Sequence, residues 1–209
     1  MSPELQKLMN DTVTVLTAML AAKDRYTGEH QHRVAQIAGN IAQEMGADPE
    51  FVEGMRVMGL LHDLGKIAIP SAILSKPGTL SRQEFDLIKM HPQQGHDLLM
   101  PIKFPWRVAL AVLQHHERLD GSGYPHGFSG SEIIPEARIL AVADVVEAMA
   151  SHRPYRPAQG LNAAMKEISE KQGALYDPEV VDGCLKMLEE TPILLRNALG
   201  KRNLSAMVL

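Results

Sequence analysis

Residues 57–63 of the chain, VMGLLHD, carry an apolar helical run directly into His62 and Asp63. Two later stretches, residues 108–116 (VALAVLQHH) and residues 139–146 (ILAVADVV), also place imidazole or carboxylate groups against apolar helical surface. A polar group buried there is costly unless it is hydrogen-bonded, paired or bound to a metal. A satisfied core histidine or a helix-end cap explains one such residue, whereas five favour one shared partner, a metal centre. The five residues are His62, Asp63, His115, His116 and Asp144.

The hydrophobic periodicity is helical along nearly the whole chain, and no alternating strand pattern exceeds a few residues. The segment Ser81-Arg82-Gln83-Glu84 predicts a capping box that opens one of the helices. Residues 118–130 contain four glycines and one proline, so we expect a loop there. These patterns predict an all-α, single-domain helical bundle with a core of Leu, Ile, Val, Ala and Met. Helices are expected near residues 5–20, 29–45, 49–62, from 81, from 91, and over 106–116, 135–150, 160–172 and 178–190.

The composition excludes several classes of protein. The 209 residues carry a formal net charge of −4, and no basic stripe suggests a protein that binds DNA. The single Cys184 excludes an intramolecular disulfide framework and a zinc ribbon built on cysteines. No run approaches the ~20 apolar residues of a transmembrane helix, and the N-terminus lacks the features of a signal peptide. We therefore expect a cytoplasmic protein without a membrane segment.

Three parts are expected along the chain. Residues 1–20 are predicted to form an amphipathic helix, which is either a natural N-terminus or the end of a linker from an upstream domain. Residues 21–190 are predicted to form the main domain, and residues 191–209 a C-terminal extension.

The residue types at the predicted metal centre indicate its chemistry. Imidazoles and carboxylates without thiolates suit Fe, Mn or Zn, while Mg prefers shells of oxygen. Because neighbouring residues on a helix diverge by about 100°, one member of the His62-Asp63 pair can be a terminal ligand while the other reaches across. A carboxylate that bridges two metals fits a hydrolytic displacement at phosphorus. His30, His91 and the His115-His116 pair could complete two coordination shells.

Two motifs carry a resemblance to a known family. His62-Asp63-Leu64-Gly65-Lys66 resembles the signature of the HD superfamily of metal-dependent phosphohydrolases. Residues 115–125, HHERLDGSGYP, resemble the HHExxDGxGYP motif of its HD-GYP branch. The resemblance spans roughly residues 15–190 and implies the HD type of helical bundle with a Gly/Pro-rich GYP loop. Further matches are YTGEH at 26–30, Arg33-Val34, His91-Pro92, Gly95, Asp144, RPYR at 153–156 and Asp177-Pro178.

The resemblance implies a ligand set for two divalent metal ions, with Fe or Mn favoured and Zn, Ni or Mg possible as isolated. Asp63 would bridge the two ions. Some members of the family hold a third ion with a Glu four residues before the position of His30, where this chain has Tyr26, a poor ligand. We therefore expect a two-metal centre. Its ligands would be His30, His62, Asp63, His91, His115, His116 and Asp144.

Other residues are implied to contact the substrate. Lys66 would stabilise phosphate charge or protonate the leaving 3′ oxygen, which makes it a catalytic residue together with Asp63. Arg153 and Arg156 would bind phosphate, since guanidinium groups match its oxygens in pairs. Tyr124 would stack on a base or order the GYP loop, and this loop has been linked in the family to contact with GGDEF-domain proteins.

The implied function is hydrolysis of cyclic di-GMP to linear pGpG by a metal-dependent phosphodiesterase, with further conversion to GMP less expected because of Tyr26. One alternative is a phosphodiesterase for another cyclic dinucleotide such as cyclic GMP-AMP. A nucleotide phosphohydrolase of the wider HD superfamily is disfavoured by the complete GYP loop. A third is a cyclic-di-GMP-binding signalling module that turns over slowly or not at all. The sequence leaves open the native metal, a homodimeric state, and whether a sensory or receiver domain precedes residue 1.

Overall fold

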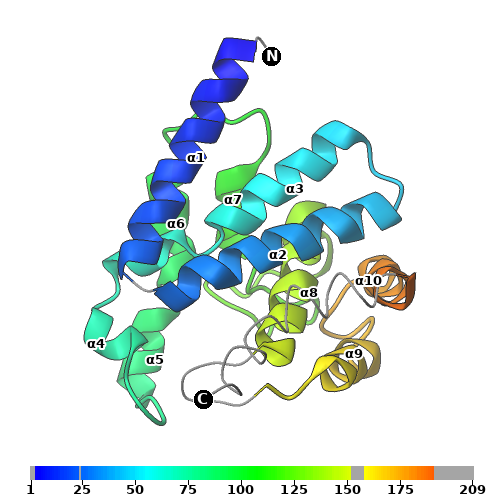
Figure 1. The fold of residues 1–209 in the computed structure, drawn as a ribbon. Helices are drawn as coiled ribbons and strands as arrows, with labels where there is room; N and C mark the ends of the chain where they lie inside the picture. Colours follow the sequence, from blue (N-terminus) through cyan, green and yellow to red (C-terminus); the bar gives the residue numbers. More distant parts are fainter. Residues whose placement is uncertain (1–2, 24, 152–157, 191–209) are drawn as a thin grey trace, which may run out of the picture.

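The computed structural model describes residues 3–23, 25–151 and 158–190, and the regular secondary structure of this part is helical, joined by loops (Figure 1). Only an isolated bridge between Gln172 and Tyr176 has β-type pairing among these residues, so the all-α prediction is confirmed. The helices are α1 (Pro3–Lys23), α2 (Arg25–Glu44), α3 (Pro49–Leu61), η1 (Leu64–Ala68, a 3₁₀ helix), α4 (Ser71–Leu74), α5 (Arg82–Ile88), α6 (His91–Leu99), α7 (Val108–Gln114), η2 (Gly130–Glu132, also 3₁₀), α8 (Pro135–Ala150), α9 (Leu161–Glu170) and α10 (Pro178–Glu190).

Local signals placed most helix starts correctly. Pro135 occupies the first turn of α8, and Ser81 and Glu84 form the predicted capping box at the start of α5. Two predicted helices had wrong boundaries. The helix predicted from residue 29 begins at Arg25, and the helix predicted over 106–116 is shorter, since Arg107 has φ −78° and ψ 47°, outside the helical region.

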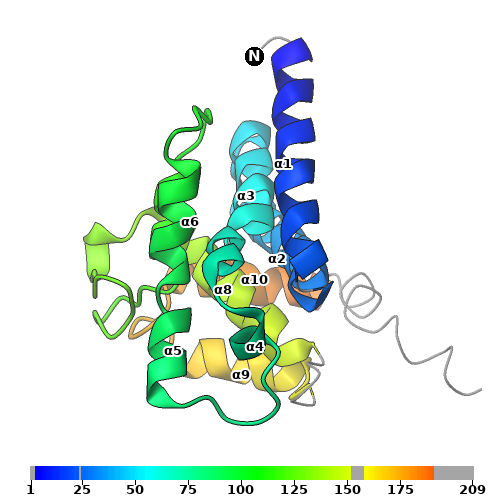
Figure 2. The ribbon, with the colours of Figure 1, turned by 90° about the vertical axis from the view of Figure 1, so that its left-hand side faces the viewer.

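Helix α2 is central to the bundle, because it packs against α3 and α8 and is also in contact with α1 and α10 (Figure 1). Helix α1 lies along α3 and rises beyond it, while α4 and α5 lie at the opposite end of the molecule (Figure 2). The core between these helices is aliphatic, and methionines fill it where aromatic side chains are scarce. Its fully buried members include Ile41, Met55, Met58, Leu61, Leu140 and Ile168.

Two glycines allow close backbone approaches between the helices that carry the motif residues. A Cβ at Gly59 of α3 would lie 2.4 Å from the Cα of Ala35, so α2 and α3 meet backbone to backbone at this point. A Cβ at Gly65 of η1 would lie 1.9 Å from the carbonyl oxygen of His91. The start of α6 therefore sits directly against η1, beside the end of α3.

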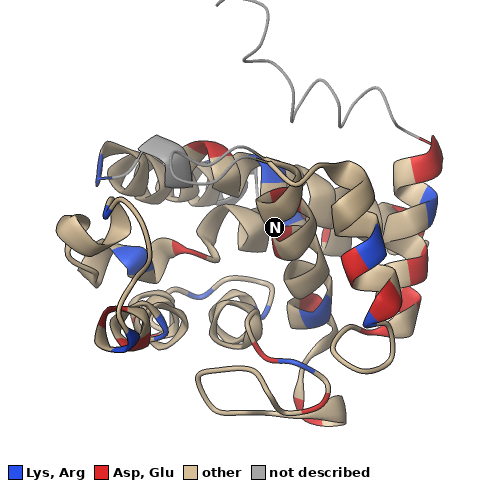
Figure 3. Ribbon diagram, turned by 90° about the horizontal axis from the view of Figure 1, so that it is seen from below, with Lys and Arg blue, Asp and Glu red and all other residues tan. Residues whose placement is uncertain are grey.

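Charged residues of both signs are interspersed over the helices (Figure 3). Among the described residues, no helix combines the length and the hydropathy needed to cross a membrane. Helix α1 is continuous across the predicted boundary at residue 20, and residues 191–209 lie outside the described residues, so the three-part division stays a prediction.

Candidate metal centre

The structure brings all seven predicted ligands into one buried region at the ends and middles of five elements. His30 lies in the second turn of α2, because this helix begins four residues earlier than predicted. Six of the seven are buried, and His116 is half-buried. Their ligand atoms form three overlapping groups, each within 4.8 Å: His30, His62 and Asp144; His62, Asp63 and His115; His91, His115 and His116.

Asp63 lies between the histidines of these groups. Its Oδ2 is 3.5 Å from Nε2 of His62 and 3.7 Å from Nε2 of His30. Its Oδ1 is 3.3 Å from Nε2 of His91, which in turn lies 3.3 Å from Nε2 of His115. The two oxygens of one carboxylate thus face different sets of imidazoles, which is the arrangement that a bridging ligand needs.

Three of the imidazoles are oriented by one local device. Nδ1 of each lies within hydrogen-bond distance of a carbonyl oxygen three residues earlier: Gly59 for His62 (2.8 Å), Ile88 for His91 (2.7 Å) and Val112 for His115 (2.7 Å). These carbonyls lie in the last turns of α3, α5 and α7, where an α-helix leaves its own acceptors unused. When Nδ1 carries the proton and donates it there, Nε2 is left as a lone pair facing the cluster, as a ligand nitrogen must be.

The buried nitrogen of His62 tests whether these residues fit a metal. Nε2 of His62 is fully buried and has no hydrogen-bond partner among the described residues. A buried polar atom without a partner costs about 1–3 kcal/mol. A divalent cation at this position would satisfy the atom together with its neighbours, so the donor set fits a metal centre of nitrogen and oxygen ligands.

The pKa values favour the protonation states of metal ligands. Burial lowers the pKa of His91 to about 4, with Asp63 opposing this effect and Lys66 adding to it. Burial also lowers the pKa values of His62 and His115. Burial acts to raise the pKa of Asp63, yet the Lys66 ammonium and the imidazoles hold it well below its usual range. Neutral imidazoles and ionised carboxylates are therefore available at neutral pH.

His30 behaves differently from the other imidazoles. Burial opposes its charged form, but hydrogen bonds with Asp144 and Glu147 outweigh burial and raise its pKa to about 9. Without a metal, His30 thus carries a second proton at neutral pH. A cation bound at Nε2 would replace that proton.

Two predicted substrate contacts border the centre. Lys66, in η1, places Nζ 2.6 Å from Oδ2 of Asp63. The Tyr124 ring lies 4.6 Å from the His116 ring, and Nζ of Lys89 lies 5.8 Å from the Tyr124 centroid. Burial raises the pKa of the Tyr124 phenol, which therefore stays protonated. Arg153 and Arg156, the predicted phosphate contacts, lie outside the described residues.

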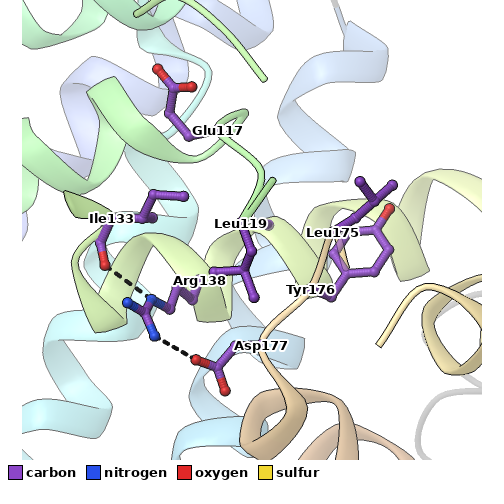
Figure 4. A pocket seen from close by; sticks show the side chains of 8 residues that line it. Glu117, Leu119, Ile133, Arg138, Leu175, Tyr176 and Asp177 are labelled. Carbon is purple, nitrogen blue, oxygen red and sulfur yellow. Dashed lines mark hydrogen bonds and ion pairs between the residues drawn. The ribbon is translucent and has the colours of Figure 1, made fainter. Parts of the chain in front are cut away.

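Arg138 of α8 is hydrogen-bonded to the end of the GYP loop, residues 118–130, and no sequence pattern indicated this role. Its guanidinium donates to the carbonyl oxygens of Ile133 (2.9 Å) and Gly130 (2.9 Å) and to Asp177 Oδ2 (2.7 Å). Figure 4 shows two of these bonds in a small pocket between the loop and the turn before α10. Arg138 thus links Gly130, at the end of the loop, to α8 and to Asp177 directly before α10.

A buried carboxylate beside the centre was also missed. Glu147 lies one helical turn after Asp144 on α8, is fully buried, and contacts His30, Arg33 and Ser151. Its spacing of three residues from Asp144 was a usable signal, since such residues share one face of a helix.

Comparison with known proteins agrees with these observations. The HD domain family matches residues 14–180. The chain is 40% identical over 185 residues to the cyclic di-GMP phosphodiesterase response regulator RpfG of Xanthomonas campestris, which covers 88% of this chain and 49% of that protein. It is 40% identical over 189 residues to a cyclic di-GMP phosphodiesterase of Thermotoga maritima, covering 90% of this chain and 51% of that protein. The chain thus spans about half the length of these relatives.

A solved structure supports the fold. A cyclic GMP-AMP specific phosphodiesterase of Vibrio cholerae, V-cGAP3, superposes with a TM-score of 0.55 at 29% identity, covering 85% of this chain and 40% of that one. The all-α fold and the extended sequence match agree with the HD-GYP resemblance that the two motifs indicated. The chain belongs to the HD domain family.

Proposed function

We propose that this chain is a metal-dependent phosphodiesterase that hydrolyses cyclic di-GMP to pGpG. The observation that carries the proposal is Asp63, whose two oxygens face separate histidine sets with inward Nε2 atoms. Relatives named as cyclic di-GMP phosphodiesterases match nearly the whole chain and support the substrate class.

The grouping of the side chains suggests how two divalent ions would be held. His30, His62 and Asp144 would hold one ion, and His91, His115 and His116 the other, with Asp63 shared between them. The nitrogen and oxygen donor set without thiolate suits Fe, Mn or Zn, and we favour Fe or Mn because the HD-GYP resemblance implies them. Bound divalent ions would supply a nucleophilic water at neutral pH and neutralise charge that develops at phosphorus.

The chain's own side chains would orient the substrate and donate a proton to the departing 3′ oxygen. Lys66 reaches the edge of the centre through its contact with Asp63, where its ammonium can neutralise phosphate charge or protonate the departing 3′ oxygen. The Tyr124 ring, beside His116, offers a face on which a guanine can stack. Arg153 and Arg156 are proposed as the phosphate-binding forks on the strength of the RPYR motif.

Chromatography of the products tests the proposal. Protein purified without oxygen and loaded with Mn or Fe is incubated with cyclic di-GMP, beside an Asp63→Ala variant and a Glu136→Gln control. Wild type and control are expected to release pGpG, while Asp63→Ala loses activity by at least 100-fold. Persistence of cyclic di-GMP with the loaded wild type, no different from Asp63→Ala, would reject the enzymatic function.

Hydrolysis of cyclic GMP-AMP is the second candidate, because V-cGAP3, at 29% identity, is a cyclic GMP-AMP specific phosphodiesterase. The two substrates are compared side by side at equal concentration on one preparation, whose metal content is measured by mass spectrometry. A higher kcat/KM for cyclic GMP-AMP would overturn the preference for cyclic di-GMP.

We also propose the GYP loop, residues 118–130, as the contact for GGDEF-domain proteins, because a loop fixed by Arg138 can present a defined surface. If the wild-type protein binds a GGDEF-domain protein and Arg138→Met raises the Kd of that complex, the contact is supported. Equal binding by the two proteins would reject it.

A further inference from the structure

Glu147 is a fully buried carboxylate that lies outside the three groups of candidate ligands. Its Oε2 is hydrogen-bonded to Nδ1 of His30. Its Oε1 accepts from Nε of Arg33 at 2.5 Å and from the Ser151 hydroxyl at 2.6 Å. A carboxylate buried at this depth is stable only with such compensation, so the site is built around the ionised form of Glu147.

The place of His30 in the fold explains why a carboxylate is needed there. The imidazoles of His62, His91 and His115 are oriented by carbonyls at helix ends, which have no partner within their own helix. His30 lies inside α2, where the nearby carbonyls already accept from the helix's own N–H groups. A side chain from another helix must therefore receive the Nδ1 proton of His30.

Helices α2 and α8 present matched pairs of side chains for this purpose. His30 and Arg33 are three residues apart on α2, and Asp144 and Glu147 are three residues apart on α8, so each pair shares one helical face. Nε2 of His30 lies 3.2 Å from Oδ1 of Asp144. Nδ1 of His30 and Nε of Arg33 are both hydrogen-bonded to the Glu147 carboxylate. The same contact thus fixes both the direction of Nε2 and the nitrogen that keeps its proton.

We propose that Glu147 is a positioning residue for the metal centre: it holds His30 with Nδ1 protonated and Nε2 directed at the ion shared with His62 and Asp144. The inference rests on the proposed metal centre and assigns no role in proton transfer to substrate. Arg33 orients Glu147 in turn, through its bond to Oε1.

The substitution Glu147→Gln tests this role with little change in shape. Glutamine offers one acceptor oxygen where glutamate offers two, and His30 and Arg33 both need an acceptor. If the amide oxygen turns to Arg33, its NH₂ group faces Nδ1 of His30 and favours the tautomer with the proton on Nε2. That tautomer cannot bind a cation through Nε2.

The control variant is Glu136→Gln. Glu136 is also a buried glutamate on α8 and is paired with an arginine, Arg107, at 2.7 and 3.0 Å, but it lies at the other end of the helix. Both variants thus remove one buried carboxylate from the same helix. Only Glu147→Gln is expected to change the metal centre.

Mn²⁺ binding to the metal-free proteins is measured by calorimetry, with circular dichroism to confirm folding. Glu147→Gln is expected to weaken one of the two binding events by about 10- to 100-fold, the usual range for loss of a residue that orients a metal ligand. The Mn²⁺ concentration for half-maximal hydrolysis rises by the same factor, while kcat at saturating Mn²⁺ recovers toward wild type. Equal affinities of wild type and Glu147→Gln at both events overturn the inference.

A second measurement needs no variant. In the Zn²⁺-loaded wild-type protein, the ¹⁵N chemical shifts of His30 report which nitrogen holds the proton. A protonated Nδ1 supports the role of Glu147, and a protonated Nε2 overturns it even if Glu147→Gln does not fold. Failure of the proposed function can be distinguished from failure of this inference. A wild-type protein that binds two ions without cleaving a cyclic dinucleotide rejects the function, but it leaves the role of Glu147 in metal binding unaffected.

Discussion

At the scale of single residues, the centre divides its imidazoles by their surroundings. Burial in an apolar region keeps His62, His91 and His115 neutral, whereas two carboxylates keep a proton on His30. Asp63 lies beside imidazoles of both kinds, the protonated His30 and the neutral His91. Opposite shifts of this size tie the stability of the metal-free protein to pH.

We predict that the metal-free protein is most stable near pH 6.5–7. The folded pKa of His91, about 4, is below its unfolded value, so its contribution is present above pH 6.5 and is lost as pH falls through 4. The folded pKa of His30, about 9, is above its unfolded value, so its contribution is present below pH 6.5 and is lost as pH rises through 9. Urea unfolding between pH 4 and 9.5 measures the free energy of unfolding on the acid side and on the alkaline side of this maximum, which are the acid and alkaline limbs of the profile.

Variants separate the two limbs of this profile. His91→Gln is expected to reduce the loss of stability below pH 6.5, to which His62 and His115 also contribute, while Glu147→Gln is expected to reduce the loss of stability above pH 6.5. His96→Gln, which removes a histidine outside the centre, serves as the control. A metal-free protein whose stability is flat from pH 6.5 to 9 would contradict the assignment for His30.

At the scale of elements, the site depends on how closely η1 and the start of α6 approach each other. A Cβ on Gly65 would meet the carbonyl oxygen of His91 at 1.9 Å and the backbone nitrogen of Gly95 at 2.5 Å. Both of these atoms are backbone, so a side chain at residue 65 must displace α6 itself. His91 is the first residue of that helix and moves with it.

We therefore predict that Gly65→Ala lowers the free energy of unfolding by about 1–3 kcal/mol, as forced overpacking does, and also weakens metal binding through His91. Gly183→Ala is the matched control, because its Cβ would meet only the flexible Met45 side chain at 2.8 Å and Ile41 O at 3.9 Å. Chemical unfolding and Mn²⁺ calorimetry of both variants check the prediction. Unchanged Mn²⁺ affinity in Gly65→Ala would contradict the prediction, because it would show that displacing α6 does not affect metal binding through His91.

Sequence signals predicted elements well where the signal is local. The apolar run after Pro135 gave both ends of α8, and the capping box gave the start of α5. The start of α2 was missed, because the segment before residue 29 is only weakly apolar and Asp24, a residue type favoured at helix N-caps, was not used as a start signal. Glu147 was missed for a related reason: a glutamate in a helix has the same local sequence whether water or His30 is its partner. The three-residue spacing from Asp144 places Glu147 on the same face of α8, but only the packing of α2 on α8 shows that His30 is its partner.

At the scale of the whole molecule, the proposed ligands come from segments spread between residues 30 and 144, on α2, the α3–η1 junction, α6, the end of α7 and α8. The motifs could predict which residues converge, because the resemblance supplied them. The sequence alone could not predict the separation of the groups or the helix-end bonds that aim them. A centre assembled from five segments should stabilise the complete fold, since the unfolded chain cannot present these ligands together.

We predict that removing the metal lowers the midpoint of thermal unfolding. An ion present at 100 times its Kd stabilises the native state by about 2.7 kcal/mol, and each kcal/mol shifts Tm by roughly 2–4 °C in a chain of this size. Chelation of the Mn-loaded protein should therefore lower Tm by about 5–10 °C, and added Mn²⁺ should restore it. Differential scanning calorimetry of Asp63→Asn is expected to show little difference between the chelated and loaded forms, because its shared ligand is weakened. Glu136→Gln should retain the full difference, and a wild type that unfolds at one temperature in both forms would reject a metal centre that bridges these segments.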